Sequence, residues 1–424
     1  MLYRILHFLM KRSIVAHYLE VKGIGLNNIP KKGPILIAAT HPNSFLDAII
    51  IAVSMNRPLY FLARSDVFKA KWAENILRSM NLIPIYRMQE GAENLNKNQD
   101  TFNECFKILE KGGAVLIFAE GISLIDKKLR PLKKGLGRIA FGFSEQNDFR
   151  KNVKVVPLSL NYDRPTSFRS KVLIGVGEAI DVGQFQKTYE GNKNKGVIEL
   201  NKLIFDALKA HTIEVEEEHH LVYKTITELD SSFIENSLAR KILMANKIKE
   251  VSHENVKEFE MLQQESAAAF STLKKYNLNF RKLKINTGLP LIEILKTVLL
   301  APLAFVAFVV NFFPFWIAKR VATKKVKLVE FYASVRLVLA TILWLVWALF
   351  IMCVGMNYSL LFLLTLPALY FAILFYLWYY EKSKYFSSAI QLRKLRKNET
   401  LYEELQGRIK HIYRLRKSLQ MTNK

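Results

Sequence analysis

The chain has 424 residues and is poor in cysteine and in acidic side chains. Its two cysteines, Cys105 in a helical pattern and Cys353 in an apolar span, do not indicate a disulfide framework. It has no set of zinc ligands, no basic zipper and no aromatic RNA-binding pattern, which argues against a nucleic-acid-binding module. The first ten residues have no long apolar core, so we expect no cleavable signal peptide.

Basic and apolar residues are abundant instead. Lys and Arg number 62 against 37 Asp and Glu, the formal net charge is +25, and half of the residues are hydrophobic. Each basic residue near an anionic bilayer surface contributes about 1 kcal/mol to membrane binding, and the bilayer interior can accommodate long apolar segments. We therefore expect membrane lipids, and not nucleic acid, as the partner of the chain.

Residues 1–20 combine apolar side chains at helical spacing, from Leu2 to Met10, with nearby basic residues. The pattern predicts either an amphipathic interfacial helix or a strut that covers the following domain. Tyr3, Phe8 and Tyr18 favour the interface, because aromatic side chains suit a headgroup boundary.

Residues 21–212 are expected to form an α/β domain. Short apolar runs typical of buried strands alternate there with helical patterns. The expected strands are 34–39, 58–63, 82–86, 114–119, 153–161 and 171–176, and the expected helices include 67–80, 98–111 and 135–147. This alternation predicts a mostly parallel sheet flanked by helices.

The remainder of the chain divides by composition. Residues 213–288 are charged, contain no proline and no glycine before Gly288, and predict a helical connector.

Within a membrane region at 289–382, runs without charge cover 297–318, 337–354 and 358–380. The last two are long enough for a transmembrane hairpin. The first has basic flanks on both sides, which favours a re-entrant or interface-lying segment and leaves its crossing open. Residues 383–424 read as a basic helical tail.

The stretch ATHPNSFLD at 39–47 follows the first apolar run of the α/β domain. Residues six apart on one continuous helix point about 240° apart, so His41 and Asp47 meet only if His41 lies on a turn and Asp47 in the first turn of a helix. Pro42 favours that break, and Asn43 or Ser44 is suited to cap the helix. A carboxylate that holds one imidazole nitrogen leaves the other as a general base.

Two further segments end expected strands, and a third lies within one. Arg87 ends IPIYR at 83–87, Glu120 and Gly121 lie within FAEGIS at 118–123, and Pro157 lies within the apolar run 155–160. Ligands bind at the carboxyl ends of parallel strands, so His41, Arg87 and Glu120 are expected at one edge of the sheet. An arginine there suits a phosphate group.

These four segments, in this order, resemble the four blocks of the phospholipid/glycerol acyltransferase family, over roughly residues 20–200. The resemblance implies transfer of an acyl group from acyl-CoA or acyl-carrier protein to a glycerol hydroxyl. It implies His41 as the general base, Asp47 as its orienting partner and Arg87 as a phosphate-binding residue. It places Glu120, Gly121 and Ser123 in the acceptor site and Pro157 in the acyl pocket.

Two features depart from the commonest pattern of that family. Five residues instead of four separate His41 from Asp47, and Glu120-Gly121 continues with Ile122-Ser123 instead of Thr-Arg. Both variants resemble the glycerol-3-phosphate/dihydroxyacetone-phosphate acyltransferase subgroup, which favours glycerol 3-phosphate as acceptor. Lys133 or Lys134 is our hypothesis for the basic contact that the usual arginine would provide.

The expected activity is therefore that of an integral membrane acyltransferase of phospholipid biosynthesis, with its catalytic domain on the cytoplasmic face. A thioester is already activated, so we expect no cofactor, no metal and no covalent nucleophile. Backbone N–H groups near the helix after His41 are candidates for stabilising the tetrahedral oxyanion. The alternatives are a lysophosphatidate or other lysolipid acyltransferase and, from another class, a non-catalytic lipid-binding membrane scaffold. Acyl chain length, the donor carrier and the oligomeric state stay open.

Overall fold

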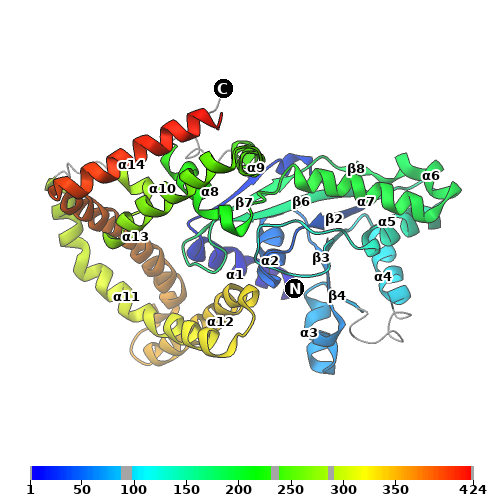
Figure 1. The fold of residues 1–424 in the computed structure, drawn as a ribbon. Coiled ribbons are helices and arrows are strands. Elements are labelled where there is room, and N and C mark those ends of the chain that lie inside the picture. Colours follow the sequence, from blue (N-terminus) through cyan, green and yellow to red (C-terminus); the bar gives the residue numbers. More distant parts are fainter. Residues whose placement is uncertain (1, 87–97, 231–237, 285–290, 422–424) are drawn as a thin grey trace. The chain divides into compact units, whose positions relative to one another are not determined.

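The computed structural model describes residues 2–86, 98–230, 238–284 and 291–421 (Figure 1). The chain divides into two compact units, which are described separately. Unit 1 comprises Met1–Thr212 and Ala322–Val338, and unit 2 comprises Ile213–Val321 and Leu339–Lys424. Unit 1 thus takes in residues 322–338, a stretch that the sequence assigns to the membrane region.

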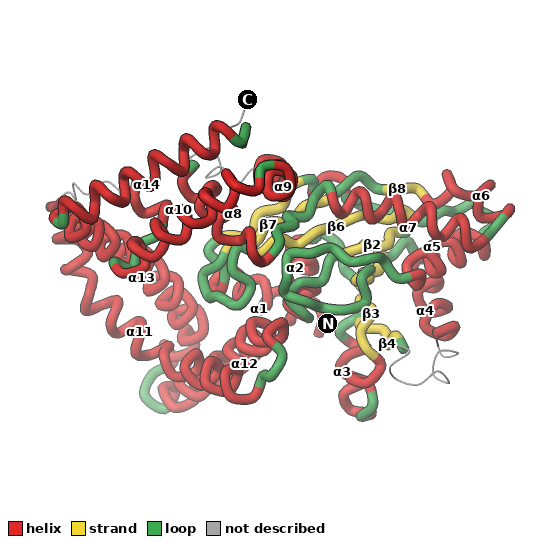
Figure 2. The backbone as a smooth tube through the Cα atoms, viewed as in Figure 1, coloured by secondary structure: helices red, strands yellow, loops and turns green. Residues whose placement is uncertain are grey.

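Unit 1 contains all the strands that the structure describes, and Figure 2 shows them gathered in one sheet. The strands are β1 (Glu20–Ile24), β2 (Ile35–Ala39), β3 (Tyr60–Arg64), β4 (Leu82–Ile85), β5 (Ala114–Phe118), β6 (Lys154–Tyr162), β7 (Lys171–Val176) and β8 (Ile180–Asp181). The helices between Leu2 and Thr212 are α1 (Leu2–His17), α2 (Phe45–Ser54), α3 (Lys71–Ser79), α4 (Asn98–Glu110), α5 (Lys134–Gln146), α6 (Gln186–Gly191) and α7 (Lys193–Lys209).

The sheet has the strand order β1-β7-β6-β2-β5-β3-β4, and β8 pairs with β6. Neighbouring strands run parallel except that β7 and β8 are antiparallel to β6. The predicted mostly parallel sheet is confirmed, and each of the six expected strands is present. The strands β1 and β8 were not predicted, since β1 is only half buried and contains a lysine and a glycine, and β8 has two residues.

Helices cover both faces of this sheet. Along β2, Leu36 and Ala38 face a core shared with α4, α5 and α7, whereas Ile35, Ile37 and Ala39 face a core shared with α1 and α2. Burial on both sides explains why the strands read as continuous apolar runs and not as alternating ones. With both faces buried, the polar side chains that follow the strands are expected at the carboxyl edge of the sheet.

The first helix, α1, has two kinds of surface. Ile14 and His17 are buried, while Leu2, Ile5 and Phe8 are exposed. The buried residues are those expected of a strut and the exposed ones are those expected of an interfacial helix. Contact of α1 with a membrane stays a prediction.

The described part of unit 2 is helical, as predicted for residues 213–288. Its helices are α8 (His220–Leu229), α9 (Leu238–Glu254), α10 (Val256–Lys275), α11 (Leu291–Lys325), α12 (Val329–Met356), α13 (Thr365–Lys397) and α14 (Glu399–Ser418), of which α11 ends and α12 begins in unit 1. The segments Ile292–Lys325, Val329–Met356 and Leu360–Lys397 are each long and apolar enough to cross a membrane.

The first of these segments is one continuous helix. Pro302 and Pro314 lie inside α11 without ending it. Its length is sufficient for a full span, so the structure gives no reason to prefer a re-entrant path, and its course through a bilayer stays a prediction. The expected break between the next two runs is present, because α12 ends at Met356.

Candidate active site

The carboxyl edge of the sheet brings the predicted motifs together. Ala39, the last residue of β2, is in register with Phe118 at the end of β5 and with Leu158 of β6. Since these strands run parallel, the turns after β2 and β5 and the last residues of β6 lie at the same edge. His41 and Glu120 therefore lie close together, although 79 residues separate them in the chain.

His41 and Asp47 form the expected pair. His41 lies on the turn after β2, and Asp47 lies in the first turn of α2. His41 Nδ1 is 3.0 Å from Asp47 Oδ2. The carboxylate is fully buried, and the imidazole is 13 % exposed. This geometry leaves His41 Nε2 as the nitrogen available to a substrate hydroxyl; the catalytic roles themselves stay predictions.

Asp47 accepts two further hydrogen bonds. The Asn43 N–H donates to Oδ2 at 2.7 Å, and the Tyr162 hydroxyl donates to Oδ1 at 2.6 Å. Burial raises the pKa of Asp47, while the hydrogen bonds from His41, Tyr162 and Asn43 oppose that shift. Burial and the nearby Asp47 charge raise the pKa of Tyr162 well above its ordinary value, so the phenol keeps the proton that it donates.

Tyr162 is a residue that the sequence analysis missed. It is the last residue of β6 and is buried at 5 % exposure. A signal was available, because it is a polar side chain at the carboxyl end of a predicted strand, as are His41 and Glu120. What the sequence lacked was any sign that this phenol would face Asp47, 115 residues away.

The Phe118 ring packs against one face of the His41 imidazole. Its ring stacks on the His41 ring with centroids 3.6 Å apart and an interplanar angle of 11°. Phe118 ends β5, and the β2–β5 register places it directly beside Ala39. Stacking on one face and the Asp47 hydrogen bond at one edge together restrict the rotation of the imidazole.

The turn between His41 and α2 has an unusual backbone. Ser44 has φ 52° and ψ −145°, a conformation that costs a non-glycine residue about 1–3 kcal/mol. The expected cap by a Ser44 side chain is wrong, since Ser44 makes no side-chain cap hydrogen bond. The Asn43 side-chain amide donates to Pro165 O at 3.0 Å. Surrounding groups therefore hold this turn.

Ser123 is one of these groups. Its Oγ accepts a hydrogen bond from the Ser44 N–H at 2.8 Å. Since the Asn43 N–H is bonded to Asp47, the first two N–H groups after Pro42 are both engaged by the protein. They are therefore not free donors for an oxyanion. The predicted contact of Ser123 with substrate stays a prediction.

Each carboxylate oxygen of Glu120 accepts a hydrogen bond from a backbone N–H group. Its Oε1 accepts from the His41 N–H at 3.3 Å, and its Oε2 accepts from the Arg130 N–H at 3.1 Å. Burial raises the pKa of Glu120, and these hydrogen bonds and the Arg130 charge oppose the shift. Arg130, which also pairs with Asp126, was not predicted as a site residue. Glu120 thus connects the turn of His41 to the loop before α5, and its role in acceptor binding stays a prediction.

Of the two predicted lysines, Lys133 lies beside the Glu120-Gly121 turn. Gly121 has φ +72°, and a Cβ added there would lie 3.1 Å from Lys133 Cγ. Lys134 points elsewhere: its Nζ donates to Asn194 at 3.0 Å, and it lines a cavity of about 680 Å³ together with Arg138. The structure therefore favours Lys133 as the lysine next to the predicted acceptor site.

The remaining predicted residues are Pro157 and Arg87. Pro157 is buried in β6, in register with Ala38 of β2, three residues before His41. Its assignment to an acyl pocket stays a prediction. Arg87 follows β4 by two residues and lies outside the described residues.

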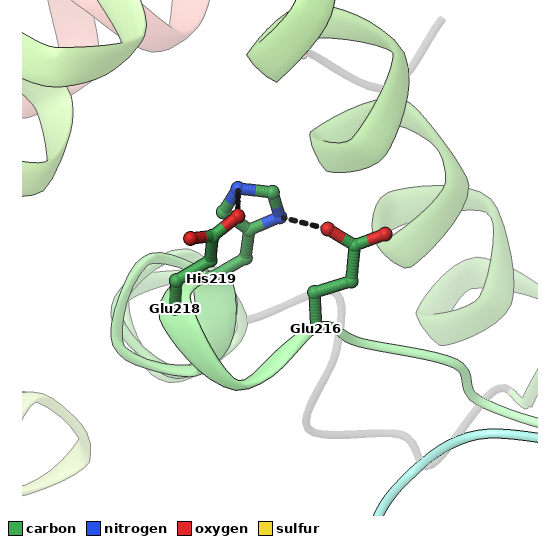
Figure 3. Close-up of side chains that lie close together, drawn as sticks. All are labelled: Glu216, Glu218 and His219. Atoms are coloured by element: carbon green, nitrogen blue, oxygen red, sulfur yellow. Dashed lines mark ion pairs between the residues drawn. The ribbon is translucent and has the colours of Figure 1, made fainter.

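A separate cluster in unit 2 comprises Glu216, Glu218 and His219 (Figure 3). The two carboxylates face different ring nitrogens: Glu216 lies 3.8 Å from Nδ1 and Glu218 lies 3.5 Å from Nε2. One ligand atom from each of the three side chains lies within 4.8 Å of the other two, a spacing that a metal ion could bridge. Lys249 Nζ also lies 3.4 Å from Glu216, so a cation of the protein already pairs with this carboxylate.

Part of the chain is similar to known acyltransferases. Residues 20–161 match the family model described as Acyltransferase. The chloroplastic 1-acyl-sn-glycerol-3-phosphate acyltransferase of Brassica napus is 27% identical over 136 residues, which cover 32% of this chain and 36% of the relative. Glycerol-3-phosphate O-acyltransferase 1 of Saccharomyces cerevisiae is 22% identical over 433 residues, covering 77% of this chain and 56% of the relative.

A solved structure is also similar. The 1-acyl-sn-glycerophosphate acyltransferase of Thermotoga maritima aligns with a TM-score of 0.35 and 22% identity, covering 49% of this chain and 80% of the other. The chain spans 36% of the length of the Brassica relative and 56% of that of the yeast relative.

Proposed function

We propose that this chain, whose residues 20–161 match the Acyltransferase family model, transfers a fatty acyl group from an acyl thioester to glycerol 3-phosphate. The observation that carries the proposal is the His41–Asp47 pair at 3.0 Å, with the second imidazole nitrogen directed away from the carboxylate. The yeast relative, whose name states glycerol 3-phosphate as its substrate, supports this acceptor.

In the proposed mechanism His41 Nε2 removes the proton from a glycerol hydroxyl as its oxygen attacks the thioester carbonyl. The tetrahedral intermediate collapses, the C–S bond breaks, and the imidazolium returns the proton to the leaving thiolate. Asp47 fixes the imidazole through Nδ1 and stabilises the imidazolium that forms. General-base assistance of this kind contributes about 10²–10⁴-fold to the rate.

The acceptor phosphate is proposed to bind to basic residues around this pair. Lys133 is exposed, lies beside Gly121 and directly precedes α5. The loop that it ends is bonded to Glu120 through the Arg130 N–H. Arg87 follows the end of β4 in the sequence, and β4 is parallel to β3 at the same sheet edge. Together these cations would offset the charge of one phosphate group.

A second acceptor is lysophosphatidate, which the name of the Brassica relative supports. Both acceptors present a hydroxyl near a phosphate, so the same base and the same cations serve either. The three membrane-length segments support a site that works on amphiphilic substrates at a bilayer. We place this site on the cytoplasmic side, with acyl-CoA or acyl-carrier protein as the donor.

The test measures acyl transfer by membranes that contain the chain or its His41→Ala variant. Labelled glycerol 3-phosphate and, separately, labelled lysophosphatidate are supplied with acyl-CoA or acyl-carrier protein. We expect the wild type to acylate glycerol 3-phosphate and His41→Ala to lose at least 100-fold, about the lower end of the range for a general base. His253→Ala, at an exposed histidine of α9, is the matched control and is expected to keep wild-type activity.

Activity on lysophosphatidate alone would keep the chemistry and replace the acceptor. Transfer that persists in His41→Ala would contradict the assignment of the base. A wild-type chain inactive with each donor and acceptor, in membranes where it is folded, would favour the non-catalytic lipid-binding alternative.

A further inference from the structure

The Asn43–Ser44 peptide group is held from both sides by serine hydroxyls. Ser123 Oγ accepts the N–H of Ser44 at 2.8 Å, and Ser334 Oγ donates to the carbonyl of Asn43 at 3.0 Å. Ser123 ends the predicted motif FAEGIS at 118–123, which follows another strand than His41 does. Ser334 lies 291 residues beyond Asn43, in α12 and far outside the matched residues 20–161.

This peptide group is where the backbone of the catalytic turn is strained. Ser44 has φ 52°, and the Asn43 N–H, on the preceding peptide, donates to Asp47 at 2.7 Å. The carbonyl and the N–H belong to the same residue, so a displacement of Asn43 would move both groups together. Ser334, which donates to the Asn43 carbonyl, therefore helps to hold the N–H group that orients Asp47.

The residues next to Ser334 in α12 also pack against the sheet domain. Ala333 is fully buried and Leu337 is 4 % exposed, and both belong to the core that contains α1 and α2. The Phe331 ring lies 6.4 Å from the ring of Phe45, the first residue of α2. Small side chains at positions 333 and 334 allow the helix backbone to approach the turn closely. The first ten residues of α12 thus belong to the catalytic unit.

The direction of the Ser334 hydroxyl also distinguishes it. A serine inside a helix commonly donates to its own helix, four residues back. Ser388 in α13 does so, with Oγ 2.7 Å from Lys384 O. Ser334 instead donates out of its helix, and both it and Asn43 are fully buried. A buried carbonyl left without a donor is costly, so this hydroxyl is a required partner of the turn.

From these contacts we propose that Ser334 is a positioning residue of the acyltransferase site, acting through Asn43 on Asp47. The inference rests on the proposed function. It means that the site is completed by a segment distant in sequence, at the start of a helix long enough to cross a membrane. Transfer then depends on the docking of α12 onto the turn.

The experiment compares full-length wild type, Ser334→Ala and Ser388→Ala in lipid nanodiscs. It measures kcat, KM for each substrate, the pH profile of kcat/KM, and hydrogen–deuterium exchange of the peptide covering residues 40–47. Ser334→Ala is expected to lower kcat roughly tenfold, about the effect of one buried hydrogen bond. KM should change less than about twofold, because substrate contacts are retained. Exchange over residues 40–47 should rise and the acidic limb of the pH profile should move.

Ser388→Ala removes a buried hydroxyl from another long helix and is expected to match wild type in kcat and in exchange over residues 40–47. Ser334→Thr keeps the hydroxyl and should recover most of the rate. If Ser334→Ala raises exchange throughout the sheet, the kcat of Ser334→Thr decides between positioning and general destabilisation. Recovery of kcat in Ser334→Thr supports the positioning role, and an equal loss of kcat in both variants overturns it. Wild-type kcat and wild-type exchange in Ser334→Ala would also overturn it. A wild-type chain without transfer would refute the proposed function, whereas exchange over residues 40–47 would still decide whether Ser334 holds the turn.

Discussion

The hydrogen bond from Tyr162 to Asp47 offers the sharpest test of the site. Tyr162→Phe removes only the hydroxyl that donates to Oδ1 at 2.6 Å and retains the buried ring. A hydrogen bond to a charged group contributes about 1.5–3 kcal/mol, and 1.36 kcal/mol corresponds to a factor of ten in rate. The hydroxyl also fixes the orientation of the carboxylate that holds the His41 ring. We therefore expect its loss to misplace the ring and to lower kcat by roughly 10-fold, with about 150-fold as the upper limit.

The same variant should change the pH dependence. Without the phenol donor, the negative charge of Asp47 is less dispersed and stabilises an imidazolium at His41 more strongly. The proton on the pair is then harder to remove, so the acidic limb of kcat/KM moves to higher pH. The assay is initial-rate acyl transfer over a range of pH, with both substrates varied.

Tyr18→Phe is the matched control. The Tyr18 hydroxyl is buried and has no hydrogen-bond partner among the described residues, and its ring lies 6.2 Å from that of Tyr162. Its removal is expected to leave kcat within about twofold, because no hydrogen bond is lost. A Tyr162→Phe enzyme with unchanged kcat and an unchanged acidic limb would refute the reasoning, and so would equal losses in the two variants.

Three further substitutions test other parts of the domain. Glu120→Ala leaves two backbone N–H groups without their acceptor; each costs about 1–3 kcal/mol, so the thermal midpoint in detergent should fall by several degrees, and an unchanged midpoint would contradict the bracing role. Burial and two nearby arginines lower the pKa of His17 to about 3, below its unfolded value, so the folded state is stabilised above about pH 6.5 and loses up to about 1.4 kcal/mol per pH unit as the pH falls toward 3. His17→Leu should flatten this loss in unfolding measured from pH 7.5 to 4.5, and parallel curves would speak against it. Lys133→Ala should raise KM for glycerol 3-phosphate several-fold more than Lys134→Ala, and the reverse order would exchange their assignments.

Much of this arrangement was readable from local sequence. Apolar runs bounded by turns predicted each of the six expected strands, because burial on both sheet faces demands continuous apolar residues. Pro42 and the spacing of His41 and Asp47 predicted a turn that lets the two side chains meet, and they do so at 3.0 Å. The resemblance to the acyltransferase blocks rested on the same local segments. All of these inferences concern residues within a few positions of one another, or strand ends whose direction the α/β alternation sets.

What local pattern did not predict is how each side chain at the sheet edge is used. The substrate contacts expected of Ser123 and Glu120 stay predictions. What was not expected is that Ser123 binds the backbone of Ser44 and that Glu120 binds the backbone of His41. Tyr162 is an ordinary strand residue until the β2–β6 register brings it to Asp47.

The sequence by itself therefore determined the α/β domain, the His41–Asp47 turn and the three membrane-length segments, because each is encoded in residue type over a short window. Only the tertiary structure decided which groups satisfy the buried polar atoms of that turn. Asp47 is held by a phenol 115 residues away, and the Asn43 carbonyl by a hydroxyl 291 residues away. The reason is physical: a buried carboxylate or carbonyl needs a partner, but any nearby donor meets that need, and which donor is near depends on packing across the whole chain.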